Sequence, residues 1–404
     1  MYVPALLAPR KEEFRFRVRE MVSFWDRRVF VRAPWRFYRG DPYWVPPLLS
    51  ERSALLDPRR NPFLRQLESA LFCAEATRGF SLDEVVGTIA VWFDARKRDT
   101  SDKASGYFGM FESINNEEVA SALLGQAETW LLERLSGLEV MRGPASLNPA
   151  HAAGILVDGF NERPGALMPY SAPCYPEMIE AAGLDVSAET LAFRLDLSGP
   201  DARRASVGND CARRAGALAT RQEVTVQPLD PQGVQGKGRQ VKGLCDLTWA
   251  AAAGFAPLTD EEFAWLVNGF ARYLDPRFCI GIERAGNLVA LGVGLPDVST
   301  AMRWGNGRLF PIGWLAHGVN RRRTRHLQVF PPVVRPDEDP EISQLLRLDL
   351  IGRAAVHGCR SIEFAPIAAD DQPLISELAL LGARGVKRYR VYEMRIAPTL
   401  TATR

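Results

Sequence analysis

The sequence predicts a mixed α/β fold built from two copies of one domain, and three observations support this prediction. The chain has 404 residues, of which 47% are hydrophobic and 24% charged, a composition typical of a globular protein with two cores. One order of apolar strands and amphipathic helices, β-β-β-α-β-α-β, occurs twice, at a separation of about 200 positions. The polar, glycine-containing stretch 199–216 separates the copies as a connection. We therefore expect domains at 1–199 and 200–404.

The elements of the first copy follow from hydrophobic periodicity. Apolar runs predict strands, and apolar positions that recur every 3.6 residues predict helices. The elements are strands at 70–76, 84–94 and 106–113, a helix after the break at 114–116, a strand at 138–145, a helix at 175–183 and a strand at 189–197. One face of the first helix is expected to be buried, and it comprises Val119, Ala122, Leu123, Gln126, Trp130 and Leu131.

The second copy repeats this order. Its elements are strands at 277–283, 287–297 and 326–334, a helix with the stripe Ile342, Leu345, Leu346, Asp349, Ile351 and Ala355, a strand at 361–367, a helix at 372–382 and a strand at 387–394. The stretch 226–243 is expected to be a second loop-rich segment. Residues 14–19 alternate strictly between apolar residues and arginine, which predicts that 14–20 is a half-buried strand rather than a nucleic-acid patch.

Charge and cysteine spacing exclude several classes of function. Fifty Lys and Arg against 48 Asp and Glu leave a net charge of +2, which argues against binding to nucleic acid through phosphate neutralisation. The six cysteines form no CxxC motif, and no two of the four histidines lie at i, i+4, so we expect no zinc site. The same dispersion argues against a disulfide framework and favours a reducing compartment.

The sequence also gives an expectation about location. The N-terminus lacks basic residues before its short apolar run, and no uninterrupted run of about 18 apolar residues occurs, so we expect no signal peptide and no membrane span. The expected location is the cytoplasm, with peripheral contact to the inner membrane through 302–326, where tryptophans adjoin an arginine cluster. The alternative is that 302–326 is an insertion that covers a sheet edge, with solvated arginines.

Several motifs resemble those of a known family. They are YRGDPYWVPPL (38–48), NPFL (61–64), YFGMFES (107–113), MRGP (141–144), GILVDGF (154–160), MPYSAPCYPEMIEAAG (168–183) and NGRLFP (306–311). With the duplicated element order, they are similar to a bacterial family of tandem proteins of the GCN5-related N-acetyltransferase (GNAT) type, one branch of which resembles bacterial ceramide synthases. The resemblance implies two GNAT-like domains, acyl-CoA as cosubstrate, no permanently bound cofactor and no metal.

The resemblance also implies where the phosphates of coenzyme A would bind, and both copies depart from it. The family's glycine-rich turn before the first long helix is replaced by 113–118 in one copy and by 334–341 in the other, with carboxylates and no glycine. We expect Asn115 or Asn116 to cap one helix, and Asp339, followed by Pro340, to cap the other. Phosphate binding would then fall to arginines such as Arg142 and Arg335; the alternative is that both are surface or ion-pair residues.

Acyl transfer to an amine needs a base and an acid near the thioester. His151 suits removal of an ammonium proton at neutral pH, and Glu112 suits it if burial raises its pKa. The alternative for Glu112 is a strand-end carboxylate that helps to cap the next helix. Tyr170 and Tyr175 flank the loop 168–175, where either could protonate the leaving thiolate, contact substrate or simply pack against proline.

The remaining candidate contacts the acceptor. Asp158 either anchors the amine or forms a turn before Gly159. The resemblance leads us to expect an acyl-CoA-dependent N-acyltransferase that acts on a lipid-like amine, such as a sphingoid base, by direct attack of the amine on the thioester. The alternatives are a non-catalytic acyltransferase-like binding protein and an enzyme that transfers an aminoacyl group.

Overall fold

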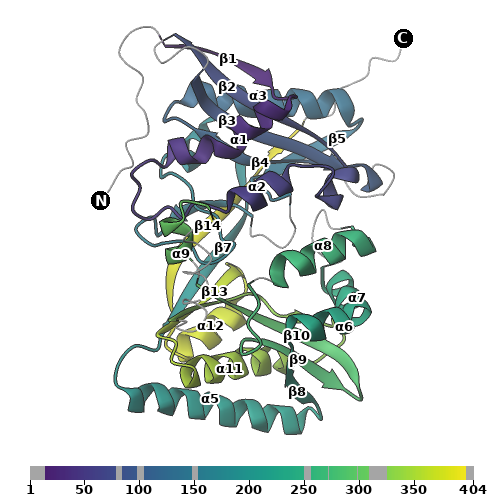
Figure 1. Ribbon diagram of the computed structural model, residues 1–404, viewed down its shortest axis with the longest axis vertical. Coiled ribbons are helices and arrows are strands. Elements are labelled where there is room, and N and C mark those ends of the chain that lie inside the picture. Colours follow the sequence, from purple (N-terminus) through teal and green to yellow (C-terminus); the bar gives the residue numbers. More distant parts are fainter. Residues whose placement is uncertain are drawn as a thin grey trace. The chain divides into compact units, whose positions relative to one another are not determined.

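The computed structural model describes residues 14–78, 84–97, 104–147, 153–249, 256–271, 273–297, 299–308 and 325–396. The chain forms two compact units (Figure 1). Unit 1 comprises residues 1–189, 305–309 and 387–404, and unit 2 comprises 190–304 and 310–386. Each unit thus contains a strand segment from the other half of the sequence. The expected domain boundary at 199–200 stays a prediction.

Unit 1 is built on a mixed sheet. Its strands, in spatial order, are β1 (Arg15–Glu20), β2 (Leu67–Arg78), β3 (Glu84–Asp94), β4 (Ala104–Ser113), β5 (Leu138–Gly143) and the last part of β14 (Arg384–Arg395). The pairs are antiparallel except β4–β5, which is parallel, and the short β6 (Ile155–Asp158) pairs with β14. The first-copy strands predicted at 70–76, 84–94, 106–113 and 138–145 are confirmed.

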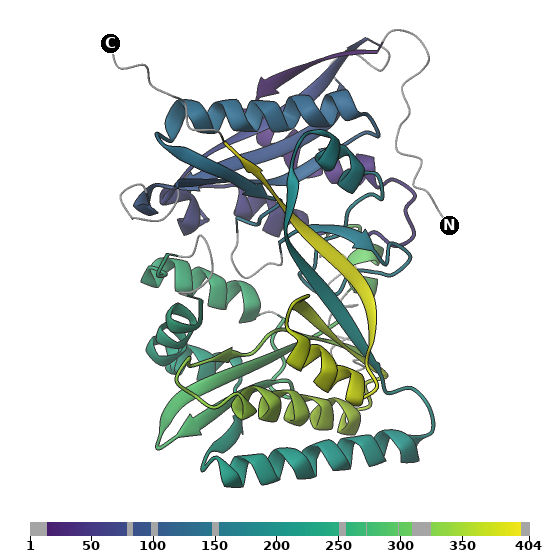
Figure 2. The same ribbon diagram turned by 180° about the vertical axis from the view of Figure 1, so that it is seen from behind.

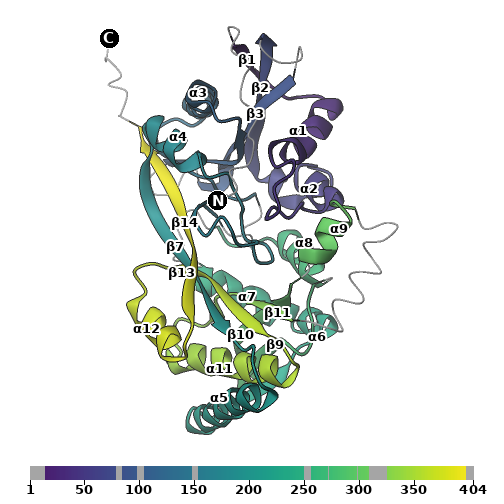
Figure 3. The same cartoon turned by 90° about the vertical axis from the view of Figure 1, so that its left-hand side faces the viewer.

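Helices cover both faces of the unit 1 sheet. They are α1 (Phe24–Phe37), α2 (Leu49–Leu55), α3 (Glu117–Arg134), α4 (Tyr175–Ala181) and the short 3-10 turns Pro62–Arg65 and Ala95–Lys97. Figure 3 shows α3 on one side of β2 and β3 and α1 on the other. The helix prediction after 114–116 is confirmed, and Asn116 caps α3 by accepting the Val119 N–H. Ala120, Leu124 and Ala127 are buried, whereas the expected Ala122 and Gln126 are only half-buried.

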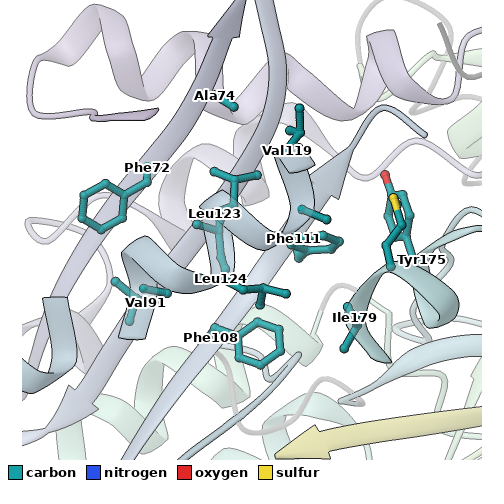
Figure 4. Close-up of a cluster of buried hydrophobic side chains, with 14 of the residues drawn as sticks. Phe72, Ala74, Val91, Phe108, Phe111, Val119, Leu123, Leu124, Tyr175 and Ile179 are labelled. Atoms are coloured by element: carbon teal, nitrogen blue, oxygen red, sulfur yellow. The ribbon is translucent and has the colours of Figure 1, made fainter. Parts of the chain in front are cut away.

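The core of unit 1 lies between β4 and α3. Phe108 and Phe111 of β4 pack in one cluster with Leu123 and Leu124 of α3 (Figure 4). Gly106 permits this close packing, because a Cβ there would lie 2.4 Å from a Leu131 methyl group. The sheet and α3 therefore form a rigid frame for the end of β4.

Unit 2 has a comparable sheet. Its strands, in order, are the second part of β7 (Asp185–Asp196), β13 (Ser361–Ala368), β11 (His326–Val329), β10 (Asn287–Pro296), β9 (Cys279–Arg284) and β8 (Thr225–Pro228). β11 and β13 are parallel, and β12 (Val333–Val334) pairs with β10. The single strand predicted at 326–334 is wrong. It is interrupted at 330–332, where two consecutive prolines offer no N–H to a ladder.

Helices also pack on both faces of the unit 2 sheet. They are α5 (Asp201–Arg221), α6 (Pro231–Gly236), α7 (Gly238–Trp249), α8 (Asp260–Ala271), α9 (Ser299–Trp304), α11 (Glu341–Val356) and α12 (Gln372–Leu380). Figure 3 shows α11 and α5 on one side of β9 and β10 and α7 on the other. The stripe predicted for α11 is buried except at Asp349, which is half-buried and pairs with Arg353.

Two loop predictions in this unit are wrong. The stretch 199–216 belongs mostly to the 21-residue helix α5, which lies along α11 (Figure 2). Its sequence is polar because, among the helix residues whose burial is described, only a narrow stripe is buried: Gly208, Cys211, Ala215 and Leu218. Glycine serves close helix packing there, since a Cβ on Gly208 would lie 2.7 Å from the Ala355 Cβ. The stretch 226–243 likewise holds β8, α6 and the start of α7.

The start of α11 differs slightly from the prediction. The helix begins at Glu341, so Pro340 rather than Asp339 occupies the cap position. The Asp339 carboxylate still accepts the Glu341 N–H at 2.8 Å. The expected stabilisation of this helix end by Asp339 is therefore present, one residue further from the helix.

Candidate active site

A β-bulge near the end of β4 determines where Glu112 points. Thr88 of β3 lies opposite Glu112, and Ala90 lies opposite Gly109, so two residues of β4 stand opposite one of β3. Met110 within the bulge has φ of +49°, a left-handed conformation that non-glycine residues adopt only at an energetic cost. The Thr88 hydroxyl donates to the Met110 carbonyl at 3.2 Å and holds the bulge.

The bulge reverses the alternation of side chains along β4. In a regular strand Phe108 and Glu112 would point to the same face, because side chains alternate with a period of two. The extra residue places Phe111 beside Phe108 in the core against α3 (Figure 4). Glu112 consequently turns away from this hydrophobic core. Its side chain faces Tyr38, which directly follows α1, Arg52 of α2 and Tyr175 of α4.

Glu112 is buried, and Tyr175 is its direct hydrogen-bond partner. Glu112 is 8% exposed, and Tyr175 is 1% exposed. The Tyr175 hydroxyl, at the first residue of α4, donates to Glu112 Oε2 at 3.0 Å and accepts the Ser113 N–H at 3.0 Å. The Tyr175 ring packs edge-on against Phe111 at 5.3 Å between centroids. Tyr175 therefore links α4 to the end of β4.

Burial dominates the electrostatics of Glu112. Loss of solvent raises the pKa of its carboxyl from 4.5 to about 7, against the lowering effects of the Arg52 charge and of hydrogen bonds from Tyr38 and Tyr175. The pKa values of Tyr38 and Tyr175 are raised by burial and then by the Glu112 charge, so both phenols stay protonated as donors. Glu112 is thus a buried carboxyl whose charge changes near neutral pH.

Arg52 of α2 supplies the positive charge near Glu112. Its Nε and Nη2 atoms are buried and have no hydrogen-bond partner among the described residues. Burial lowers the pKa of the guanidinium, and the negative charge of Glu112 opposes that shift. Unpaired buried donors are rare in folded proteins, so these two N–H groups are available to an oxygen acceptor that enters the site.

Tyr170 lies next to this cluster but uses its hydroxyl elsewhere. The Tyr170 hydroxyl donates to Asp41 Oδ2 at 2.8 Å. Asp41 is 7% exposed, and its other oxygen accepts the N–H groups of Tyr43 and Trp44. The Tyr38 hydroxyl reaches the Tyr170 carbonyl oxygen at 3.5 Å. Asp41 and Tyr170 therefore fix the loop that follows α1 against the segment that precedes α4.

Three other residues predicted for the site have partners of their own. Arg142 on β5 donates to Glu393 of β14 at 3.0 Å, and Arg335 pairs with Asp337 at 2.6 Å. Asp158 is exposed and accepts the N–H of Gly159, as a turn-forming residue does. His151 lies outside the described residues.

The turn between β4 and α3 is shaped for helix capping. The Ile114 N–H donates to Val86 in the sheet, the Asn116 N–H donates to the Ile114 carbonyl, and the Asn116 side chain occupies the Val119 N–H. Glu117 and Glu118 fill the first turn of α3. These groups do not form the phosphate cradle expected at this position in the resembled family. We therefore assign no residue of this turn to the phosphates of coenzyme A.

Sequence reasoning missed Tyr38, Asp41 and Arg52. Tyr38 and Asp41 belong to the motif YRGDPYW, which carried the resemblance but no assigned role. The spacing YxxD of Tyr38 and Asp41, followed by the aromatic residues Tyr43 and Trp44, is the sequence signal that could have identified them. Arg52 has no local signal, because only the packing of α2 brings its guanidinium near β4.

Within the described ranges, no helix is both long and apolar enough to cross a membrane. The segment 302–326 is described only at 302–308, 325 and 326. Within it, Trp304 is 75% exposed. The membrane contact expected there stays a prediction.

Comparison with known proteins gives relatives along most of the chain. No family model matches the sequence. Protein YghO of Escherichia coli strain K12 is 29% identical over 390 residues, which cover 94% of this chain and 95% of that protein. The bacterial ceramide synthase of Caulobacter vibrioides is 28% identical over 290 residues, 72% of each chain.

Solved structures establish the fold. A tandem GNAT protein from the clavulanic acid biosynthesis pathway aligns with a TM-score of 0.55 at 13% identity, over 95% of this chain and all of that chain. A GCN5-related glucosamine N-acetyltransferase region of a fungal multidomain β-N-acetylglucosaminidase aligns with a TM-score of 0.52 at 11% identity, over 95% of this chain and 38% of that one. The chain has the tandem GNAT fold, as the resemblance implied.

Proposed function

We propose that this chain is an N-acyltransferase that moves an acyl group from coenzyme A to the amine of a lipid-like acceptor, with a sphingoid base as the acceptor to test first. The observation that carries the proposal is Glu112, a buried carboxyl with a pKa of about 7 at the end of β4. The tandem GNAT fold supports acyl transfer. The relative named as a bacterial ceramide synthase supports a long-chain amine as acceptor.

Glu112 is the proposed general base. Its carboxylate takes a proton from the acceptor ammonium, and the freed nitrogen lone pair attacks the thioester carbonyl carbon. The nitrogen of the tetrahedral intermediate carries one proton more than the amide. This proton passes to the thiolate as the carbon–sulfur bond breaks, so that free coenzyme A leaves as a thiol. The products are an amide and a thiol, with no metal and no covalent enzyme intermediate. A pKa near 7 lets Glu112 accept the proton at neutral pH.

The neighbours of Glu112 have distinct proposed roles. Tyr175 fixes the carboxylate through its hydroxyl, which is itself held by the Ser113 N–H. Arg52 keeps part of the Glu112 population ionised by lowering its pKa. The two unpartnered N–H groups of Arg52 suit an oxygen of the acceptor or of the thioester. Tyr170 supports the site through Asp41 rather than as an acid, because its hydroxyl already donates there.

The test is an acyl-transfer assay with purified protein. Palmitoyl-CoA and sphinganine are incubated with the parent, Glu112→Gln and a matched control, Glu133→Gln, which changes an exposed carboxylate on α3. Thiol release and amide formation are followed by a thiol reagent and by mass spectrometry. We expect product from the parent and from Glu133→Gln, and a rate lower by about 10²-fold or more in Glu112→Gln, the usual contribution of a general base.

Three outcomes decide between the functions. Product formation that Glu112→Gln leaves unchanged removes Glu112 as the base. Absence of product with other long-chain amines as well removes the lipid-amine acceptor. If calorimetric titration also detects no binding of coenzyme A or palmitoyl-CoA, the chain is a non-catalytic protein with this fold, an alternative that the atypical turn before α3 favours.

A further inference from the structure

The outward face of α1 exposes an unusual group of large apolar side chains. Val22, just before the helix, is 73% exposed, Phe24 is 66% exposed, Trp25 is 69% exposed, and Val29 is 46% exposed. Large aromatic residues normally bury most of their surface, so two adjacent exposed rings beside two exposed valines need a reason.

Helix geometry gathers these residues on one side. Residues 24, 25, 28, 29 and 32 share one face of α1, since neighbours on a helix recur at three or four positions. All five are exposed, whereas Phe30, Pro34 and Phe37 on the opposite face are buried in unit 1. The exposed apolar side chains are therefore not part of the hydrophobic core of unit 1. Val22, Phe24, Trp25, Arg28, Val29 and Arg32 form what we call the α1 patch.

The charge around the α1 patch is strongly positive. Residues 14–40 contain eight arginines and two carboxylates, in a chain whose net charge is only +2. Asp26, the acid within α1, is engaged by Arg19 at 2.8 Å and by Ser23 in a capping box. Glu20, the other acid, lies on β1. From neighbouring strands, Glu75 pairs with Arg17 and Arg19, and Glu84 pairs with Arg36. Arg28 and Arg32 form no ion pair with the described residues, so these two are the arginines that the patch offers to an anionic partner.

Arg28 connects the apolar and basic parts of the patch. Its guanidinium lies over the Phe24 ring at 5.8 Å and over the Trp25 ring at 5.3 Å from the centroid. In this arrangement the rings can enter the boundary between headgroups and acyl chains while the arginine remains at headgroup level.

We propose that the α1 patch docks onto the surface of a lipid bilayer that carries anionic headgroups. Phe24, Trp25 and the two valines insert into the interface, and Arg28 and Arg32 bind the headgroups. Exposed apolar area and basic charge on one helix face are the two contributions that hold an interfacial helix on a bilayer. The proposal does not rest on the proposed function, since bilayer binding needs neither substrate nor catalysis.

The experiment is cosedimentation of the full chain with vesicles. Vesicles of phosphatidylcholine with 30 mol% phosphatidylglycerol are compared with vesicles of phosphatidylcholine alone, at low and high salt. We expect the parent to bind the anionic vesicles at least tenfold more strongly than the neutral ones, and to lose most of that preference at high salt because the headgroup contacts are screened. Light scattering of the parent without vesicles reports self-association.

Four variants separate the patch from other exposed surfaces. Phe24→Ser with Trp25→Ser, and Arg28→Glu with Arg32→Glu, should each weaken binding to anionic vesicles at least tenfold at an unchanged thermal midpoint, because all four side chains are already exposed. Leu380→Ser, at an exposed leucine of α12, is the matched control and should bind as the parent does. Trp304→Ser tests the segment 302–326, and a loss of binding confined to this variant would assign the contact to that segment instead.

Several results would overturn the proposal. They are an absence of vesicle binding by the parent, unchanged binding by both patch variants, and a loss of binding confined to Trp304→Ser. A parent that self-associates, and that becomes monomeric in Phe24→Ser with Trp25→Ser without binding vesicles, would assign the patch to a second copy of the chain instead.

Discussion

Replacement of Glu112 by glutamine should change how the stability of the protein depends on pH. Burial raises the pKa of Glu112 from 4.5 to about 7, so folding favours the protonated carboxyl. The stabilising contribution of this group is therefore complete below the unfolded value and is lost as the pH rises through about 7. A glutamine side chain cannot titrate, so the Glu112→Gln variant lacks this loss.

The size of the effect follows from the two pKa values. Between pH 5 and pH 8 an isolated group with this shift lowers the free energy of unfolding by about 2.5 kcal/mol. For a folding unit of this size, that corresponds to a change of about 5–10 °C in the thermal midpoint. The measured quantity is the midpoint of Glu112→Gln minus that of the parent, at pH 5 and at pH 8, so that the contributions of other groups cancel.

The assay is differential scanning fluorimetry on intrinsic tryptophan, with Glu133→Gln as the control. We expect the difference between Glu112→Gln and the parent to increase by about 5–10 °C from pH 5 to pH 8, and the control to show no such increase. An equal difference at both pH values would mean that Glu112 titrates as an ordinary carboxyl. The argument that burial prepares it as a base would then be refuted.

Three further predictions test the frame around Glu112 and the packing of unit 2. Arg52→Met should raise the pH midpoint of the Glu112 titration by about 1 pH unit or more, and Arg52→Lys should restore it. The midpoint is read from the same thermal experiment. Equal midpoints in Arg52→Met and the parent would mean that the Arg52 charge does not lower the pKa of Glu112. Met110→Val should destabilise the protein by about 1–2 kcal/mol, because a β-branched residue resists φ of +49°. Met110→Gly should keep both the bulge and the activity. A urea titration in which Met110→Gly is less stable than Met110→Val would contradict the bulge geometry. Gly208→Leu should cost about 1–3 kcal/mol through overpacking against Ala355, whereas Gly216→Leu, on the same helix with no neighbour within 4 Å of the added Cβ, should not lower the thermal midpoint.

The strands and the main helices could be predicted because each is a local pattern. β3, β4 and α3 combine continuous apolar runs or a 3.6-residue period with a clear break at 114–116. The helix α5 was predicted as a connection because it buries only a narrow stripe, so its composition resembles that of a polar linker. Its partner surface on α11 is more than a hundred residues away in the sequence, and no local pattern reports it.

The site shows the same division between local and long-range information. Glu112 and Tyr175 were candidates from their places at a strand end and in a loop, yet their hydrogen bond joins residues 63 positions apart. The bulge at Met110, which turns Glu112 away from the core, has Gly109 directly before it as a local signal, but that glycine does not tell which residue of the strand is the extra one. Arg52 reaches the cluster only through the packing of α2. The assembly of a titratable carboxyl with two phenols and one guanidinium therefore depends on the structure.

The measurement that tests the central claim most directly is the pH dependence of kcat/KM for acyl transfer from palmitoyl-CoA to sphinganine. If Glu112 is the base, kcat/KM of the parent rises about tenfold per pH unit at low pH and levels off above its apparent pKa near 7. Glu112→Gln then has a rate lower by about 10²-fold or more, without this rise. A variant with the parent's rate and the parent's pH profile would contradict the account.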